Sequence, residues 1–306
     1  MTKLTASSAA FHGFGLIRRD PLAFLGVALL MTAYSAYLAV AILPAYAELM
    51  ELSLSGVADP ETLTAASMSM AGAGGLAGLL ILPLYAAILG AINRSLVFGA
   101  SQGWLLGLKL GMDELRVVLV TIVGYILTFL PYFGVALAGF VLATGMAAGV
   151  AAAGGGDAAA GVAVLLIIPV YFLALGVMIW VGIRLSFAGP ASVGEGRFVI
   201  FESWSMTKGR FWTLFLAYLL QFVIVFVAYL VVGIIVAAVF GASMVAAGQQ
   251  EFTGVPSVSV GPAQAVIGGF VYAVIVTFFT CGFLGVAARG YVDWKDAQGS
   301  TIADHF

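Results

Sequence analysis

Long apolar runs, separated by short polar or small-residue segments, fill most of the chain. A spanning helix needs roughly 20 apolar residues to cross about 30 Å of hydrocarbon. None of the runs alternates apolar and polar residues as membrane β-strands do, so we expect helices. The runs that are long enough are Pro21–Ala47, Ala71–Asn93, Leu115–Val150, Ala158–Gly189, Phe211–Ala247 and Pro262–Ala288. The pattern predicts an all-α membrane protein in which residues 1–306 form one domain with six transmembrane helices.

Two of these runs are longer than a perpendicular helix requires. The third and the fifth have about 36 residues each, on the order of 54 Å as helix. We therefore expect them to tilt or to project beyond the bilayer. The third run also contains Pro131 and Gly134, where it could divide into two short spans.

Composition supports the membrane class. Apolar residues make up 63% of the 306 residues, charged residues 8%, and the mean hydropathy is +1.14. A soluble protein has about 25% charged residues. The net charge of −2, with no dense basic run, argues against a nucleic-acid partner. One Cys and two His leave no disulfide framework and too few ligands for a structural metal site. We expect no cofactor.

The charges also predict a topology. With the N-terminus in the cytoplasm, all 12 Lys and Arg residues fall in cytoplasmic segments. The opposite loops then carry only carboxylates: Glu48, Glu51, Asp59, Glu61, Asp157 and Glu251. A break in the third run would move half of the bases to the wrong side, so we expect it to form one helix. Both termini are predicted to be cytoplasmic, and the short loops favour a bacterial inner membrane. The first run is too long for the core of a cleavable signal, so we expect an uncleaved span.

An internal repeat is one interpretation of the helices. Pro83 and Tyr85 in the second run recur as Pro169 and Tyr171 in the fourth. A Gly follows each Tyr by five residues, and an Arg ends the second, fourth and sixth runs: Arg94, Arg184 and Arg289. This favours three helical hairpins in parallel repeat. The alternative is that these matching positions arise by chance in a sequence composed of few apolar residue types.

The two longer cytoplasmic connectors carry aromatic and basic residues. Ser95–Glu114 contains Trp104, Leu105, Leu108 and Lys109, and Ala191–Gly209 contains Phe198, Phe201, Trp204 and Lys208. A helix with an aromatic face and a basic edge lies in the headgroup zone, so we expect two interfacial amphipathic helices. Gly209 is suited to a left-handed cap before the fifth span. The predicted interfacial anchors are Trp104, Phe198, Phe201, Trp204 and Trp212.

The second connector also carries a recognisable motif. A Ser-Trp pair at Ser203 and Trp204 precedes a Thr-basic-Gly-basic-Phe-Trp stretch at Thr207 to Trp212. This segment resembles one in the membrane domain of some bacterial glycerophosphoryl diester phosphodiesterases and of related uncharacterised multi-pass proteins. Their phosphodiesterase chemistry lies in a separate soluble barrel. The resemblance covers about twenty residues directly and implies a membrane module without the enzyme.

Several short sequence patterns match catalytic motifs by letter, but each lacks the context that the motif requires. Gly99–Gly103 matches the sequence of a nucleophile elbow. No strand is expected before it, and no His is expected near it as a base, because His12 and His305 lie in polar tails. Ser205 and Lys208 match Ser-x-x-Lys without its companion motifs. Gly72–Ala77 matches a dinucleotide fingerprint without a preceding strand. Small residues that allow close helix packing explain Gly74/Gly78 and Gly145/Gly149 better. We therefore expect no enzyme.

Polar groups within the spans are neutral, whereas charges are predicted at helix ends. The neutral groups are expected to hydrogen-bond between helices: Tyr34, Ser35, Tyr85, Tyr125, Thr128, Tyr171, Gln221, Thr277, Thr280 and Cys281. Alternatively, Tyr85, Tyr171 and Gln221, with Pro83 and Pro169, form a candidate polar pathway. No ionisable group is expected at the bilayer centre, which argues against a proton-coupled pump.

The basic residues at the cytoplasmic helix ends suggest lipid contact. Arg94, Arg184 and Arg289, with Lys208 and Arg210, are candidates for binding anionic lipid headgroups; simple snorkelling is the alternative. The sequence favours a non-enzymatic protein that organises lipid or accompanies a larger membrane complex. Membrane lipids are the expected partners, with a membrane-protein partner or a homo-oligomer as further candidates. A transporter or channel for a neutral or lipid-like solute is the alternative function.

Overall fold

The computed structural model describes residues 4–55, 60–99, 107–155, 158–248 and 262–299. Every regular element in these ranges is a helix, which confirms the all-α class for the described residues. The helices are α1 (Ala6–Arg19), α2 (Pro21–Ser55), α3 (Pro60–Phe98), α4 (Met112–Ala152), α5 (Ala158–Leu185), α6 (Ala188–Gly194), α7 (Glu202–Met206), α8 (Phe211–Gly248) and α9 (Pro262–Ala297).

Five helices in the described part of the chain are long and apolar enough to cross a membrane. They are α2, α4, α5, α8 and α9. In α3, which has 39 residues, the apolar stretch found there is the shorter Pro83–Phe98. The structure therefore supports a membrane-embedded helical protein.

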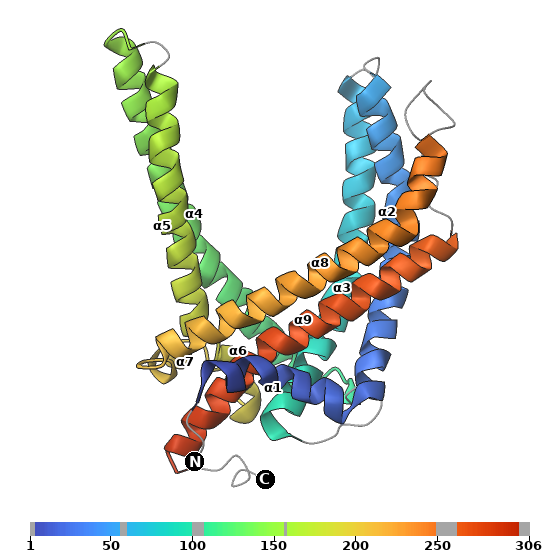
Figure 1. Cartoon of the computed structure of the whole chain (residues 1–306), viewed down its shortest axis with the longest axis vertical. Coiled ribbons are helices and arrows are strands. Elements are labelled where there is room, and N and C mark those ends of the chain that lie inside the picture. The colour runs from blue at the N-terminus through green and yellow to red at the C-terminus, as the bar shows by residue number, and fades with distance from the viewer. Residues whose placement is uncertain (1–3, 56–59, 100–106, 156–157, 249–261, 300–306) are drawn as a thin grey trace.

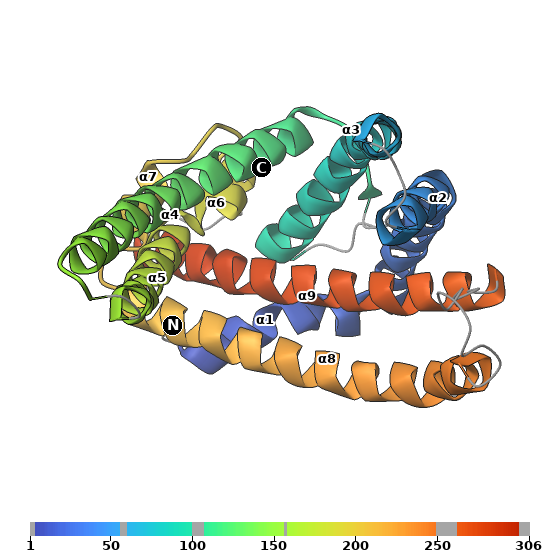
Figure 2. The same ribbon diagram turned by 90° about the horizontal axis from the view of Figure 1, so that it is seen from above.

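Consecutive long helices pack in pairs: α2 with α3, α4 with α5, and α8 with α9. The first two pairs rise as separate arms, while α8 and α9 run obliquely between them (Figure 1). The same oblique pair forms one side of the molecule seen from above (Figure 2). α8 has 38 residues and α9 has 36, well beyond the roughly 20 needed to cross a bilayer, and the inclination accommodates their length.

All the shorter helices lie at one end of the molecule, with the start of α2 and the ends of α3, α5 and α9 (Figure 1). We call this the basic end, because the described Lys and Arg residues gather there: Arg18, Arg19, Arg94, Lys109, Arg116, Arg184, Arg197, Lys208, Arg210, Arg289 and Lys295. The largest buried cluster also lies here, where Leu16, Ile92, Phe187, Leu214 and Tyr291 meet. The arms beyond this core leave most large apolar side chains exposed, as expected for surfaces that lipid covers.

Four long helices continue through an internal proline, among them α2 through Pro44. α4 runs unbroken from Met112 to Ala152 through Pro131, which confirms that the third apolar run is one helix. α3 and α5 likewise continue through Pro83 and Pro169. The helix breaks that would expose backbone groups along a solute path are therefore not seen at these prolines.

The N-terminal helix α1 was not predicted. Its N-cap Thr5 and Ser8 form a capping box, and the helix packs across α9 and α8. Gly13 lies so close to α9 that a Cβ there would overlap the backbone of Cys281 and Gly282. The assignment of His12 to a polar tail is wrong, because His12 is part-buried in α1 with Nε2 3.3 Å from the Leu96 carbonyl oxygen. His305 lies outside the described residues.

The predicted glycine contacts are also wrong in part. A Cβ at Gly74, Gly145 or Gly149 would meet nothing within 4 Å, and no side-chain environment is described at Gly78. Close approaches occur instead at the basic end and along α9. There, a Cβ would overlap a neighbouring helix at Gly13, Gly90, Gly282, Gly285 and Gly290, and in the α4–α5 arm a Cβ at Gly139 would overlap Val170. Spacing on one helix could not reveal which glycines face a partner.

The predicted interfacial helices differ from the observed connectors. Gly107 to Leu110 is not α-helical, and Trp104 and Leu105 lie outside the described residues. The second connector forms two short helices, of which α6 is almost wholly buried against α3, α4 and α9. Gly196, with a φ of 61°, lies between them, so Phe198 and Trp204 do not share one helix. Gly209 does adopt a left-handed conformation, with a φ of 80°.

Hydroxyl groups within the long helices bond to their own helix. Ser35 donates to the Met31 carbonyl, Thr128 to Gly124, Thr277 to Ala273 and Thr280 to Val276. The expectation of bonds between helices is wrong for these four groups. The i−4 carbonyl is always within reach of a helical Ser or Thr, so burial in lipid does not require a partner helix.

Candidate functional site: a basic aromatic pocket

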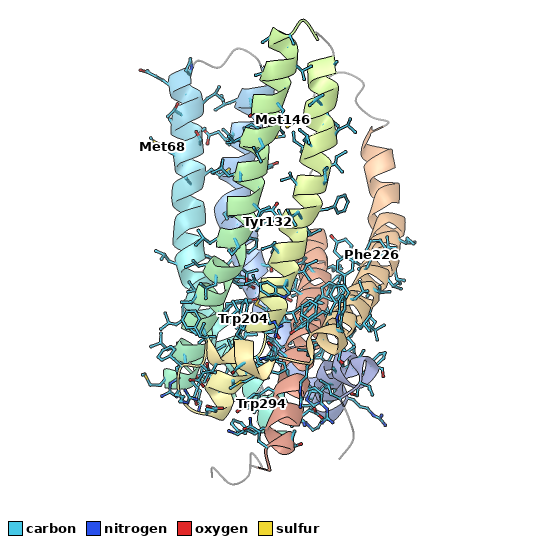
Figure 3. The ribbon with its side chains drawn as sticks, turned by 90° about the vertical axis from the view of Figure 1, so that its left-hand side faces the viewer. Met68, Tyr132, Met146, Trp204, Phe226 and Trp294 are labelled. Carbon is cyan, nitrogen blue, oxygen red and sulfur yellow. The ribbon has the colours of Figure 1, made fainter. Side chains whose placement is uncertain are left out.

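A pocket of about 660 Å³ opens at the basic end, between the end of α5 and α7. Its walls are Arg184, Phe201, Trp204, Ser205 and Lys208. Trp204, which lies low on the α5 side of the molecule, marks its position (Figure 3). Four of these five residues were singled out from the sequence as headgroup ligands or interfacial anchors, and the structure brings those four together.

Aromatic rings surround the guanidinium of Arg184. Its Cζ lies 5.8 Å from the ring centre of Trp204, 6.0 Å from that of Trp180 and 5.9 Å from that of Phe211. Trp180 and Trp204 meet edge to face with their centroids 4.9 Å apart. Ring faces attract cations, so these contacts hold Arg184 at the pocket wall without neutralising its charge.

The Ser-Trp and Thr-basic-Gly motif builds this pocket. The Ser203 hydroxyl donates to the Arg184 carbonyl at 2.8 Å and accepts from the Phe187 N–H at 3.2 Å. The Thr207 hydroxyl lies 3.0 Å from the Ser203 carbonyl and 3.4 Å from that of Arg184. The last carbonyls of a helix have no partner within it. Ser203 and Thr207 therefore tie α7 to the end of α5 and place Trp204 beside Arg184.

The rest of the motif turns the chain into α8. Gly209 supplies the positive φ of the turn, and Arg210 forms an ion pair of 2.5 Å with Asp293 of α9. Phe211 and Trp212 begin α8, with Phe211 against Arg184 and Trp212 72% exposed. The motif thus positions the pocket between α5, α7 and α8.

Two pocket cations have no carboxylate partner among the described residues. Neither Arg184 nor Lys208 forms an ion pair there, and Arg184 Nε is buried without a hydrogen-bond partner. Most other cations of the basic end are paired, as the contacts Arg94–Glu114, Arg116–Asp113, Arg197–Glu202 and Arg210–Asp293 show. Arg18 and Lys109 are exposed and form no ion pair among the described residues. The pocket therefore presents positive charge that the protein itself does not compensate.

The remaining headgroup candidates lie in other environments. Arg94 is 5% exposed and pairs with Glu114, so it is not accessible to a headgroup. Arg210 is occupied by Asp293. Arg289 is half-buried in α9, where its charge acts on His12. Of the five predicted cations, only Arg184 and Lys208 line the pocket.

The candidate pathway residues are not assembled around this pocket. Pro169 and Tyr171 are exposed on α5, and Pro83 is exposed on α3. Tyr85 is half-buried on α3 and packs against the cluster of Leu89, Val117 and Val193. Gln221 is fully buried where α8 faces Gly282 of α9. These side chains lie on three different helix pairs.

Two pocket features were missed from the sequence. Trp180 and Phe211 complete the aromatic surround of Arg184; Trp180 precedes Arg184 by one helical turn on α5, which is a readable signal. Ser205 was considered only as part of Ser-x-x-Lys. Its hydroxyl donates to the Glu202 carbonyl at 2.7 Å, so the structure gives no sign of an activated Ser–Lys pair.

Fold and pocket together define a helical membrane protein with an uncompensated basic pocket at one end. Comparisons with protein-family models, curated proteins and solved structures gave no match. The functional argument therefore rests on the residues themselves.

Proposed function

We propose that this chain is a non-enzymatic multi-pass membrane protein that organises lipid by holding an anionic headgroup in the Arg184–Lys208 pocket. The observation that carries the proposal is the pair of cations without carboxylate partners. A headgroup phosphate would supply the missing negative charge, and Arg and Lys are the residues that recognise phosphate. The surrounding Trp and Phe side chains suit the headgroup level, where amphipathic rings concentrate.

The proposed topology has six spans with both chain ends in the cytoplasm. The helix pairs support it, because α2–α3, α4–α5 and α8–α9 each leave the basic end and return to it (Figure 1). The gathering of Lys and Arg at that end agrees with the positive-inside rule. A bacterial inner membrane, where anionic lipids are abundant, is the proposed location.

Analysis of co-purified lipid tests the proposal. We expect the wild-type protein to retain more phosphatidylglycerol, relative to zwitterionic lipid, than the double variant Arg184→Gln/Lys208→Gln. The matched control is Arg18→Gln/Lys109→Gln, which removes the same charge from exposed positions of the basic end. Equal retention by both double variants and the wild type would overturn the pocket assignment.

Solute transport is the weaker candidate. The continuous helices at Pro83 and Pro169 and the separation of Tyr85, Tyr171 and Gln221 provide no continuous polar lining among the described residues. The accessory-subunit form of the proposal is compatible with lipid binding at this pocket.

A further inference from the structure

We infer that the pocket takes an entire anionic diacyl phospholipid, with its phosphate between Arg184 and Lys208 and its acyl chains between α5 and α8. This inference rests on the proposed function and deepens it, because it names the ligand class and the path of its apolar part. A soluble phosphate compound would satisfy the two cations equally well but would leave that path unused.

The two helices meet at the pocket and diverge from it. α5 ends at Leu185 beside Arg184, and α8 begins at Phe211, whose ring lies 5.9 Å from the Arg184 guanidinium. From this shared point α5 rises steeply while α8 runs obliquely across the molecule (Figures 1 and 2). The axes of α5 and α8 therefore separate with distance from the headgroup level.

Both helices expose large apolar side chains along this length. Tyr171, Phe172, Leu173 and Trp180 on α5 are more than one-third exposed, as are Leu216, Leu219, Phe222 and Phe226 on α8. Phe211 to Phe226 spans about 22 Å along the inclined axis of α8. An acyl chain that starts at the pocket can thus follow exposed apolar side chains of α5 and α8 away from the headgroup level.

The position of the charge selects the occupant. A basic pocket at the foot of two apolar helix faces matches an amphipathic anion, whose charged and apolar parts are joined. The aromatic rings at Trp180, Trp204 and Trp212 mark the level at which the two parts of a lipid meet. Continuity between the basic pocket and the apolar faces favours the phospholipid over a free phosphate.

Photocrosslinking from α8 tests this path. A photoreactive phenylalanine analogue replaces Phe226, which is 54% exposed (Figure 3), in bilayers with a minority of phosphatidylglycerol in phosphatidylcholine. The control replaces Phe133, 61% exposed on α4 next to Tyr132, which lies at a similar height. We expect adducts at position 226 to be enriched several-fold in phosphatidylglycerol and adducts at position 133 to match the bulk mixture. Arg184→Gln/Lys208→Gln should remove the enrichment.

The outcomes separate this inference from the proposed function. One outcome is that the pocket variant retains less lipid while wild-type adducts at position 226 show no enrichment. That result would support the headgroup site and overturn the acyl-chain path. Equal lipid retention by the wild type and the pocket variant, together with inorganic phosphate binding that only the pocket variant loses, would assign the pocket to a soluble anion and overturn both. Enrichment that persists in the pocket variant would also overturn the inference, since the headgroup would not then be held by Arg184 and Lys208.

Discussion

Arg94 near the end of α3 and Glu114 in the first turn of α4 form a buried ion pair that joins the two arms at the basic end. Gly90 makes room for it, because a Cβ there would come within 2.8 Å of Glu114 Cγ. Glu114 also accepts the Gly111 N–H at 2.9 Å, and Arg94 donates to the Gly107 carbonyl at 3.1 Å. The pair thus holds the Gly107–Gly111 part of the connector, next to the start of α4.

Removing one partner of this pair should be costly. We expect Glu114→Gln to lower the free energy of unfolding by about 3–5 kcal/mol, because Arg94 would remain buried without its countercharge. The double variant Arg94→Met/Glu114→Leu should recover much of the loss. Thermal unfolding in detergent measures both. The control Asp113→Asn disrupts the more exposed pair with Arg116 and should cost less than about 1 kcal/mol. A Glu114→Gln protein as stable as the wild type would contradict this role.

Docking of α1 depends on a glycine contact. We expect Gly13→Leu to displace α1 from α9, because even a Cβ at this position overlaps the Cys281 and Gly282 backbone. Gly15→Leu is the control, since a Cβ there meets nothing within 4 Å. Hydrogen exchange of residues 6–19 should be much faster in Gly13→Leu only. Equal protection in the two variants would show that α1 is held elsewhere.

α1 should also respond to acid through His12. Burial lowers the pKa of His12 below its usual 6.5, an effect that the Leu96 carbonyl partly opposes and the charges of Arg289 and Arg19 reinforce. Because the folded state binds the proton less readily than the unfolded state, stability is greatest above pH 6.5 and falls as the pH drops through 6.5 towards the folded pKa. We expect α1 to lose exchange protection between pH 7.5 and 5.5 in the wild type. The same loss in His12→Gln would assign the pH dependence to another group.

Gln221 is a buried amide without a partner. Its side chain is fully buried, and neither its nitrogen nor its oxygen has a hydrogen-bond partner among the described residues. An unsatisfied buried polar group costs about 1–3 kcal/mol. Gln221→Leu should therefore raise the thermal unfolding temperature, whereas Leu214→Gln, which adds such a group to the core, should lower it. A destabilised Gln221→Leu protein would show that the amide has a stabilising partner.

The sequence predicted the long helices well and their contacts poorly. Hydropathy and length identify a membrane-spanning helix without reference to any neighbour, so the runs that contain Pro131 and Pro169 were placed correctly. Glycine contacts depend on which helix lies opposite, which explains why Gly13 was overlooked and Gly145 was misjudged. α1 was missed because its 14 residues are too short and too polar for a hydropathy criterion.

The pocket was predicted as a set of residue types but not as a geometry. Basic and aromatic residues near helix ends indicated Arg184, Trp204 and Lys208, which the structure places at one pocket. The same reasoning selected Arg94, because the sequence does not distinguish a helix-end cation that faces lipid from one that faces a carboxylate. Only the packing of α3 against α4 reveals Glu114 as its partner.

Native mass spectrometry of the protein released from nanodiscs tests the central claim most directly. In discs with a minority of phosphatidylglycerol, the wild type should carry a resolved adduct of one anionic lipid. Each cation near a lipid phosphate contributes about 1 kcal/mol, so Arg184→Gln/Lys208→Gln should weaken that binding roughly 30-fold and remove the adduct. Arg18→Gln/Lys109→Gln should keep it. An identical adduct distribution in all three proteins would contradict the lipid-binding pocket.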